Sequence, residues 1–575
     1  MIECSRKMKI RSVHHKMKNH YQLLKEHFFQ NLESTLKAYE TRMDPETSAL
    51  EKSAFLGLDD PGYYGCFYPW CILGYYMSDS PRYHDKKLLE YAVAALEKYE
   101  TYIHEDGSVD LIETNFHDPA QTGFHVKAYF GVTEILVKFS EHTELEEKLL
   151  EITVRILSKM GEAMSTLGFH TPNHRWVISA SLSIAYRYTQ NPKFLETIDR
   201  FLMEGIDCDE NGEYTERSTG SYNNICNHSF LLLAYFLNDP SFLEYPRRNL
   251  NLMFSFTEPD LTVNTLNSTR WDQGGQYSIA PYYIFYLILA LWDENPEFSY
   301  MADTIIEKLD LPSALSIYQC DILSFFMLFP EMIQKQEALE SKAPAKDQTK
   351  FLPNSNIARI YKPENDLVIT LLGTRHPVFM QLNYGSSIIQ VRYAGSFFGD
   401  PHSQFRAREI KPTEDGFRLI CDESAGYRSQ FEEKPETSEW RHMDHSKRKI
   451  INIQHFHTEI TVHIKEDGAV LDIETSGCER IPTKLEFVMM PGGKLDTPSF
   501  ATYPKAGDYL FIKEGSARYF LDGRRYVEID GGFFAHTYAE HMRGAFPADE
   551  KKVTLAMTAT TPQRSTVEIH AKRIY

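Results

Sequence analysis

The spacing of apolar residues changes once along this chain, and that change limits what it can fold into. From about residue 20 to residue 335, apolar residues recur at intervals of three and four, which is the pattern of amphipathic helices. From residue 351 onward they alternate with polar residues or form short runs that end at Gly, Asp or Asn, which is the pattern of strands and turns. A chain of 575 residues also favours more than one domain. We therefore predict a helical domain followed by a strand-rich one.

The helical part consists of separate blocks joined by short polar turns. The clearest blocks are 88–103, 126–141, 145–164, 175–189, 227–237 and 277–292. Each helix must bury one face against its neighbours, in either an open solenoid or a closed ring. No repeat of fixed period is visible, so we predict an (α/α) toroid, an incomplete barrel, over residues 1–335.

A charged, aromatic-poor stretch over residues 336–350 is typical of a linker. Strands are predicted beyond it within 379–395, 450–477, 483–493, 509–532 and 552–561. Repeated hairpins of this kind predict an antiparallel β-sandwich over residues 351–575.

Charge and cysteine content exclude several classes of partner. A protein with a formal net charge of −19 repels the phosphate backbone of a nucleic acid, so we expect no nucleic-acid partner. An anionic sugar could bind only in a locally basic cleft. No apolar run is long enough for a membrane span or a signal peptide. Eight scattered cysteines without a CxxC motif favour reduced, buried thiols. We expect a cytoplasmic protein without membrane contacts, and a homo-oligomer is left open.

Polar residues gather where apolar helices begin, and the first such segment is GFHTPNHRWVISASL. Asn173 and His174 stand at the edge of the helix, where free backbone N–H groups favour an anion. An amide and an imidazole there could hold a carboxylate. Alternatively, Asn173 is only a helix cap.

The second segment, ERSTGSYNNICNHSF, has more polar residues than a helix cap needs. Tyr222 is a candidate proton carrier, although a single tyrosine among 34 is more often a packing residue. Arg217, Asn224 and His228 are candidate substrate-binding residues around it.

Two further segments could line the same cavity. In NSTRWDQGGQYS, Arg270 could clamp a carboxylate, Trp271 could stack on a sugar ring and Tyr277 follows a Gly-Gly turn. An ordinary loop with an Arg–Asp ion pair fits equally well. Upstream, His117 and Gln121 precede an apolar helix and are candidate binding residues, with capping as the alternative.

Histidines are the notable residues of the strand-rich part. His402 follows FFGDP in a turn. His455, His457 and His463 fall on one face of a predicted strand, a pattern that can bind zinc, but the sequence provides no clear third ligand. We favour a solvated strand face. We expect no required cofactor, and a structural divalent metal in this domain has no support in the sequence.

The NHRW motif (173–176) followed by ERSTGSYNN (216–224) is similar to motifs of the heparinase II/III-like and alginate lyase superfamily of polysaccharide lyases. The resemblance implies an incomplete toroid joined to a β-sandwich. It also implies that Asn173 and His174 neutralise a uronate carboxylate, that Tyr222 transfers the proton and that His402 assists. His174 and Tyr222 are 48 residues apart, which suits the family's spacing, whereas STGSY lacks the family's proline and the HGHxD-like signature is missing.

This resemblance predicts a carbon–oxygen lyase that cleaves uronate-containing oligosaccharides by β-elimination and leaves unsaturated sugars. Hydrogen-bond donors must stabilise the enediolate-like transition state, and Asn173, His174 and Arg270 are the candidates. One alternative is a glycoside hydrolase on the same scaffold, which would use two carboxylates. Its candidate carboxylates are Asp118, Glu216 and Asp272. Another alternative is a non-catalytic carbohydrate-binding protein.

Overall fold

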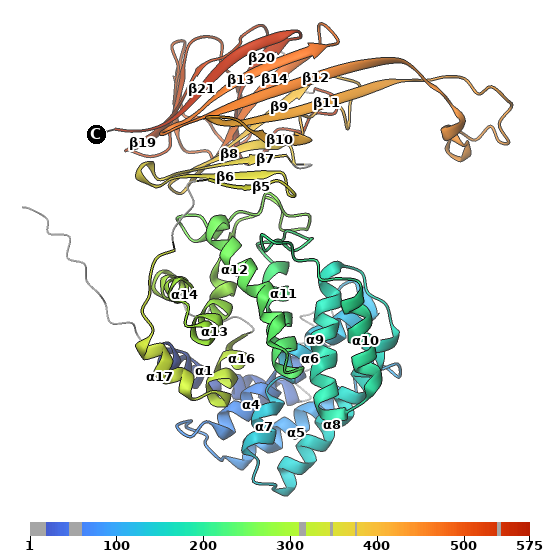
Figure 1. Ribbon diagram of the computed structural model, residues 1–575, viewed down its shortest axis with the longest axis vertical. Coiled ribbons are helices and arrows are strands. Elements are labelled where there is room, and N and C mark those ends of the chain that lie inside the picture. The colour runs from blue at the N-terminus through green and yellow to red at the C-terminus, as the bar shows by residue number, and fades with distance from the viewer. Residues whose placement is uncertain are drawn as a thin grey trace, which may run out of the picture. The chain divides into compact units, whose positions relative to one another are not determined.

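The computed structural model describes residues 19–44, 60–309, 318–344, 349–373, 376–537 and 542–574 (Figure 1). The chain divides into two compact units. The first combines Met1–Met253 with Ser278–Pro344, and the second combines Phe254–Tyr277 with Ala345–Tyr575. The first is helical and the second strand-rich, so the fold is a mixed α+β fold. Among the described helices, none is both long enough and apolar enough to cross a bilayer.

Helices of the first unit begin where the sequence supplies a cap or a proline. Thr143 and Glu146 form a capping box at the start of α8, and prolines open α6, α9, α10 and α14. The described helices are α1 His20–Met43, α3 Gly62–Gly65, α4 Phe67–Tyr76, α5 Lys86–Glu100, α6 Pro119–Tyr129, α7 Thr133–Phe139, α8 Glu144–Thr166, α9 Pro172–Thr189, α10 Pro192–Met203, α11 Tyr222–Phe236, α12 Glu244–Phe256, α13 Tyr283–Asp293, α14 Pro296–Lys308, α16 Gln319–Leu328 and α17 Glu331–Ala338.

One predicted helical block is in fact two helices. The apolar residues of 126–141 are divided between the end of α6 and α7 by a turn that includes Phe130 and Gly131. The helical spacing continues across the turn because both helices bury apolar side chains, Val126 on one side and Ile135 on the other. Periodicity alone could not locate this break.

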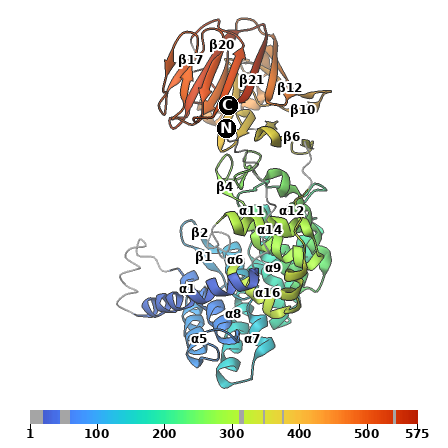
Figure 2. The ribbon, with the colours of Figure 1, turned by 90° about the vertical axis from the view of Figure 1, so that its left-hand side faces the viewer.

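Helices distant in sequence are neighbours in the first unit (Figures 1 and 2). Helix α9 contacts α6, α8, α10 and α11, and α1 contacts both α4 and α16. His20 fastens α1 to later helices, because its Nδ1 lies 2.8 Å from the Tyr283 hydroxyl and its Nε2 lies 2.8 Å from Asp303 Oδ1. The first described helix therefore contacts the last part of the unit, while the incomplete (α/α) toroid stays a prediction.

The second unit contains two large sheets. The nine-stranded sheet has the order β10 Glu409–Pro412, β11 Gly416–Arg428, β12 Ile450–Lys465, β13 Gly468–Gly477, β21 Gln563–Arg573, β19 Arg525–Gly531, β18 Ala517–Phe520, β15 Lys494–Asp496 and β16 Ala501–Thr502. The eight-stranded sheet has the order β17 Tyr509–Phe511, β20 Val553–Thr560, β14 Pro482–Met489, β9 Ser387–Gly395, β8 Val378–Tyr384, β7 Leu367–Leu372, β6 Ile357–Lys362 and β5 Thr349–Leu352. Described pairings are antiparallel except for β17 with β20. Small two-stranded pairs join β1 Val109–Leu111 to β2 Asn115–Asp118 and β3 Thr262–Val263 to β4 Tyr277–Ser278.

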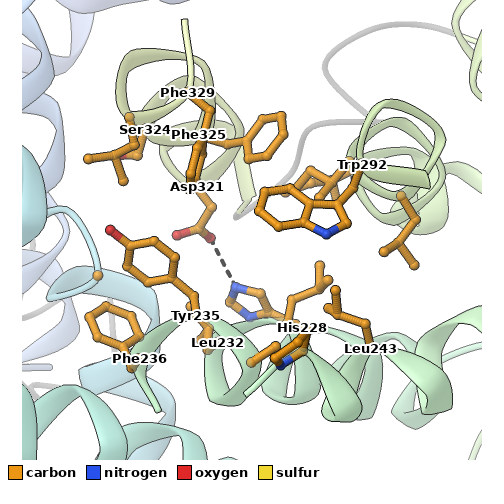
Figure 3. Close-up of a pocket in the computed structure, with 18 of the residues that line it drawn as sticks. His228, Leu232, Tyr235, Phe236, Leu243, Trp292, Asp321, Ser324, Phe325 and Phe329 are labelled. Carbon is orange, nitrogen blue, oxygen red and sulfur yellow. Dashed lines mark ion pairs between the residues drawn. The ribbon is translucent and has the colours of Figure 1, made fainter. Parts of the chain in front are cut away.

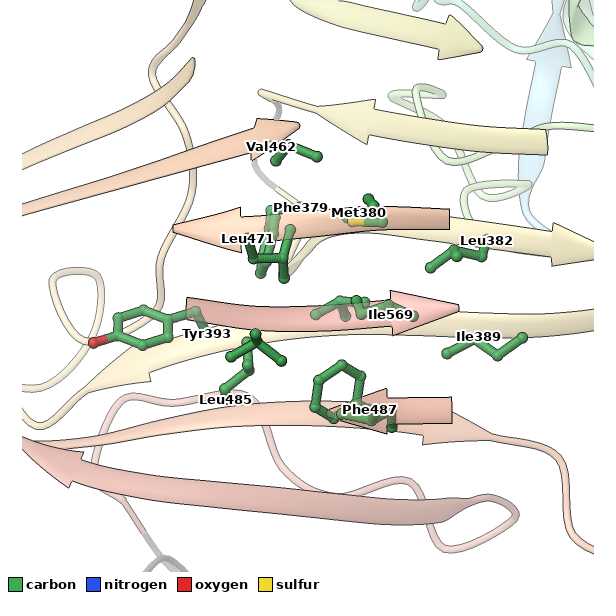
Figure 4. Close-up of a cluster of buried hydrophobic side chains, with 14 of the residues drawn as sticks. Phe379, Met380, Leu382, Ile389, Tyr393, Val462, Leu471, Leu485, Phe487 and Ile569 are labelled. Carbon is green, nitrogen blue, oxygen red and sulfur yellow. The ribbon is translucent and has the colours of Figure 1, made fainter. Parts of the chain in front are cut away.

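The two large sheets share one hydrophobic core (Figure 4). Leu382 and Phe487 enter it from the eight-stranded sheet, and Leu471 and Ile569 enter it from the nine-stranded sheet. Side chains alternate between the two faces of a strand, so the polar residues between these apolar ones lie on the opposite faces.

On that opposite face of the eight-stranded sheet, a row of polar side chains crosses four strands, and all of them except the partly exposed Gln390 are buried. Arg359, Thr370, Gln381 and Gln390 pair in register across β6, β7, β8 and β9. Arg359 is fully buried, and its Nη1 donates to Glu258 Oε1 at 2.8 Å. Glu258 belongs to residues 254–277, a segment of the predicted helical domain that lies in the second unit and is called the excursion below.

Replacing Leu382 with alanine should lower the free energy of unfolding by about 2–5 kcal/mol, because the side chain is fully buried in the shared core and truncation leaves a cavity. Chemical denaturation followed by circular dichroism measures the change. Ile451→Ala is the control, since Ile451 is 44% exposed and should change stability little. Equal effects of the two variants would contradict the shared core.

Candidate functional site

Asn173 connects the start of α9 to the loop that precedes α11. The N-cap of α9 is Thr171, so Asn173 is not the cap of this helix. Its Nδ2 donates to Glu216 Oε2 at 2.9 Å and to Thr171 Oγ1 at 2.9 Å. This amide therefore joins two segments that lie 43 residues apart.

His174 follows in the first turn of α9 and is partly exposed. Its Nδ1 accepts a hydrogen bond from the His170 backbone N at 3.4 Å, and its ring packs edge-on against Phe124 of α6. Helix α6 lies close to α9, because Ser181 Oγ donates to Gly123 O at 2.6 Å. The imidazole is thus positioned at the helix start with part of its surface open.

Tyr222 is the first residue of α11 and is partly exposed. Its backbone N donates to Ser218 Oγ at 3.0 Å, and the Tyr282 hydroxyl donates to Thr219 O at 2.7 Å, so the preceding loop is held from two sides. Arg217 in this loop has a φ of 51°, a backbone conformation that costs energy for a residue with a side chain. Such strain is common at functional sites.

Two asparagines beside these residues contain buried polar atoms without hydrogen bonds. Among the described residues, neither amide atom of Asn223 has a partner, and neither does Asn173 Oδ1. Buried polar groups are nearly always paired in proteins, so each exception calls for an explanation. Buried polar atoms without a hydrogen-bond partner thus lie at the start of both α9 and α11. Polar groups of a ligand could form the missing hydrogen bonds.

Other candidates on α11 have structural partners. Asn224 Oδ1 accepts a hydrogen bond from the Tyr318 hydroxyl at 3.2 Å. His228 Nε2 lies 3.3 Å from Asp321 Oδ2, within ion-pair distance but without hydrogen-bond geometry. His228 and Asp321 line a cavity of about 420 Å³ whose other walls are mostly apolar, between α11, α13 and α16 (Figure 3).

Lys127 lies buried next to this cluster. Its Nζ donates to Ile225 O and Ser229 Oγ, both at 3.2 Å. Burial lowers the pKa of Lys127 to about 7, against the opposing effect of Cys226 and Asp321. Burial and the charge of Lys127 lower the pKa of His228, while Asp321 opposes the shift. Lys127 was not among the residues predicted from the sequence, although a single lysine within an apolar block was a visible signal.

The candidates upstream of α6 form their own contacts. Gln121 Nε2 lies 3.0 Å from His125 Nε2, and His125 Nδ1 lies 3.0 Å from the Tyr99 hydroxyl. Burial lowers the pKa of His125 to about 4, so it is neutral at neutral pH. His117 Nδ1 lies 2.7 Å from Asp106 Oδ2 on the β1–β2 hairpin.

Four of the predicted site residues belong to the second unit. His402 Nδ1 lies 2.5 Å from Glu423 Oε2, and Glu423 also accepts a hydrogen bond from Arg408 at 2.7 Å. In the excursion, Trp271 is 66% exposed and its ring meets Tyr277 edge-on. Arg270 is in the same loop, where its backbone N donates to Ser268 Oγ at 3.0 Å.

The three strand histidines each have separate partners. His455 Nδ1 lies 2.8 Å from Ser424 Oγ, His457 Nδ1 lies 2.6 Å from Asp422 Oδ1, and His463 contacts Asp415 and Asp472. Across the described ranges, no group of three His, Cys, Asp or Glu residues has an arrangement suited to a metal ion. The cysteines from Cys66 to Cys478 are free thiols.

Comparison with known proteins gives a likeness of fold. No protein-family profile and no curated protein matches the sequence. The fold is similar to that of a mutant of the heparan sulfate lyase HepC from Pedobacter heparinus, with a TM-score of 0.50 and 11% identity over 90% of this chain and 78% of that one. It is also similar to a Paenibacillus xanthan lyase, with a TM-score of 0.53 and 8% identity over 97% of this chain and 56% of that one. A third similar structure is the Streptomyces coelicolor A3 chondroitin AC lyase in complex with chondroitin sulphate. Its TM-score is 0.50, with 9% identity over 97% of this chain and 81% of that one.

Asn173→Asp should destabilise the protein, by on the order of 3 kcal/mol at pH 7, because it places a second buried carboxylate beside Glu216. Two such carboxylates share a proton, which raises the pKa of the pair above its unfolded value. The loss should therefore be small near pH 4 and grow as pH rises. Urea unfolding at several pH values measures it. Asn295→Asp is the matched control, because an aspartate still caps α14 there.

Lys127→Met should remove a pH dependence of stability. The folded pKa of about 7 lies below the ordinary lysine pKa of 10.5, so the unfolded chain binds more protons between these pH values. The free energy of unfolding of the wild type should therefore rise by about 1.4 kcal/mol for each pH unit above pH 7, until the pH reaches the unfolded pKa. The variant should lack this contribution, and the pKa of His228 should rise, as measured by NMR titration. The exposed Lys138→Met control should change neither.

Proposed function

We propose that this protein is a polysaccharide lyase that cleaves uronate-containing glycans by β-elimination. The observation that carries the proposal is the hydrogen bond from Asn173 to Glu216, which fastens the start of α9 to the loop leading into Tyr222. It connects the two motifs that the lyase hypothesis requires. The likeness of fold to lyases of heparan sulfate, xanthan and chondroitin supports the reaction class.

The proposal includes the finer architecture predicted from the sequence. We take the helical unit to be an (α/α) toroid, because α1 contacts α16, near the other end of the helical series. That the toroid is incomplete follows from the resemblance to the lyase superfamily. We take the second unit to be a β-sandwich, because its two sheets share one core.

Elimination requires loss of the proton at C5 of the uronate and departure of the C4 oxygen. The electron pair of the C5–H bond forms the C4–C5 double bond, and the proton passes to a base. Charge accumulates on the carboxylate in the transition state, so donors must be aimed at it. His174, partly exposed at the start of α9, is the proposed donor to that carboxylate.

Asn173 acts as a positioning residue in this scheme. Its Nδ2 already donates to Glu216 and Thr171, whereas its Oδ1 has no hydrogen-bond partner among the described residues. Oδ1 can accept a hydrogen bond from a sugar hydroxyl. The role of Asn173 as sole neutraliser of the carboxylate, which the resemblance implies, would require the amide to release Glu216 first.

Tyr222 is the proposed base, and it can also protonate the leaving oxygen. A phenol acts as a base at neutral pH only where cations or hydrogen-bond donors stabilise its anion. Arg217, five residues earlier in the same strained loop, is the proposed cation. His402 is a candidate for a second proton carrier, since Glu423 engages its Nδ1 and leaves Nε2 for proton transfer.

The hydrolase alternative is weaker on the same contacts. It needs two carboxylates flanking the scissile bond. Asp118 caps α6, where its Oδ1 accepts hydrogen bonds from Ala120 N and Gln121 N. Asp272 is buried in the second unit and accepts a hydrogen bond from Ser268.

Tyr222→Phe should lower the rate of elimination by about 10²-fold or more, because it removes the proposed proton carrier while keeping the ring. The assay is the near-ultraviolet absorbance of unsaturated products from a panel of uronate oligosaccharides. Tyr83→Phe, at a tyrosine that is 47% exposed, should keep full activity. Full activity of Tyr222→Phe would refute the assignment, and cleavage without new absorbance would favour the hydrolase.

A further inference from the structure

The polar face of the eight-stranded sheet contains a chain of side-chain amides, of which Gln381 and Asn383 are buried and Gln390 is partly exposed. Gln390 Nε2 donates to Gln381 Oε1 at 2.9 Å, and Gln381 Nε2 donates to Asn383 Oδ1 at 2.8 Å. Gln381 and Asn383 are two residues apart on β8, so they share a face, and Gln390 is paired in register with Gln381. Three amides are thus connected head to tail.

Lys552 sets the direction of this chain. Its Nζ donates to Gln390 Oε1 at 3.3 Å, and an ammonium group can only donate. The oxygen of Gln390 must therefore face Lys552, so its NH₂ faces Gln381, and the same reasoning orients Gln381 and Asn383. The ends of the chain are chemically different, because a cation stands at one and the Asn383 NH₂ at the other.

The Asn383 NH₂ has donors to spare. Asn383 is 6% exposed, and no hydrogen bond from its Nδ2 is found within the part of the chain that the structure describes. Hydrogen bonds in a chain polarise one another, so a cation at one end strengthens the donor at the other. An acceptor with negative charge would be the best partner for this group.

A cavity of about 260 Å³ adjoins these amides. It is lined by Gln381, Asn383, Gln390 and Lys552 on one side and by residues of the excursion, including Asn264 and Thr265, on the other. A single water molecule needs roughly 10–15 Å³, so the space suits a larger polar ligand. Planar amides and a hydroxyl on facing walls are groups that can bond to the hydroxyls of a sugar ring.

The charged side chains in and around this cavity include both signs, and Glu258 and Lys552 are the charged residues that line it. Burial, with the positive charges of Arg392, Lys552 and Arg406, lowers the pKa of His376 to about 4. Acidic groups nearby are already paired. Glu258 is bonded to Arg359, Glu486 lies 3.1 Å from Arg392, and Asp549 lies 3.6 Å from Lys552. Each of these carboxylates is therefore balanced by a cation, which reduces its repulsion of an anionic sugar in a chain with a net charge of −19.

We infer that the second unit has its own binding site for an acidic sugar residue, with Asn383 Nδ2 directed to the carboxylate and Gln381, Gln390 and Lys552 directed to ring hydroxyls. The choice of a uronate rests on the proposed function, whereas binding itself requires no elimination step. The site would hold one residue of a glycan independently of Tyr222.

The test measures binding of D-glucuronate and D-glucose to the full chain by saturation-transfer NMR. Neither monosaccharide has a glycosidic bond at C4, so elimination does not interfere. Glucuronate should bind and glucose should bind at least tenfold more weakly, because only glucuronate has a carboxylate. Asn383→Asp should weaken glucuronate binding by roughly tenfold to a hundredfold, since it replaces the donor with a carboxylate. Lys552→Met should also weaken it and reduce its salt dependence.

Asn365→Asp is the matched control, because Asn365 lies in a turn and bonds to Glu466 O outside the cavity. Circular dichroism verifies that each variant is folded. Wild-type glucuronate binding by both Asn383→Asp and Lys552→Met, or equal binding of glucose and glucuronate, would overturn the inference. Failure of the proposed function is recognised separately, as undiminished elimination by Tyr222→Phe alongside glucuronate binding that still depends on Asn383.

Discussion

The burial of Arg359 organises the polar side of the second unit. A guanidinium removed from water is costly unless it is paired and hydrogen-bonded. Arg359 meets this demand with Glu258, Thr370 and the backbone oxygen of Ser255, and two of these three partners come from the excursion 254–277. The ion pair therefore fixes the excursion over the sheet. The amide chain and the cavity beside it depend on that cover.

The helical unit uses amides differently. Asn227 links the Tyr214 hydroxyl to Asn249, so deep in the unit the amides are satisfied by one another. At the starts of α9 and α11, Asn173 Oδ1 and both amide atoms of Asn223 have no partner among the described residues. Stability alone would favour satisfied groups at these positions. The unsatisfied amides therefore mark this end of the two helices as the better place to look for ligand binding.

Much of the fold could be predicted because the buried face of a helix or strand requires apolar residues at the period of that element. The block 175–189 predicted α9, which spans Pro172–Thr189, and the change of period near residue 350 predicted the sheets. The split of 126–141 into two helices was not visible, because apolar side chains are buried on both sides of the turn.

The candidate site was less predictable, since its contacts join distant residues. The position of Asn173 at a helix start was readable, but its bond to Glu216, 43 residues away, was not. In FMQLNYG, Gln381 and Asn383 have the alternation of a solvent-facing strand side. What covers that side comes from a segment more than a hundred residues earlier, which local sequence cannot reveal.

The excursion also has a consequence for how the protein is made. Glu258 and Arg359 are separated by 101 residues, so residues 254–277 leave the ribosome well before β6, which contains Arg359. Until β6 is synthesised, the Glu258 carboxylate stays hydrated and residues 254–277 have no sheet to pack against. The second unit can therefore complete its assembly only late in translation, after the helices around the excursion have had time to form.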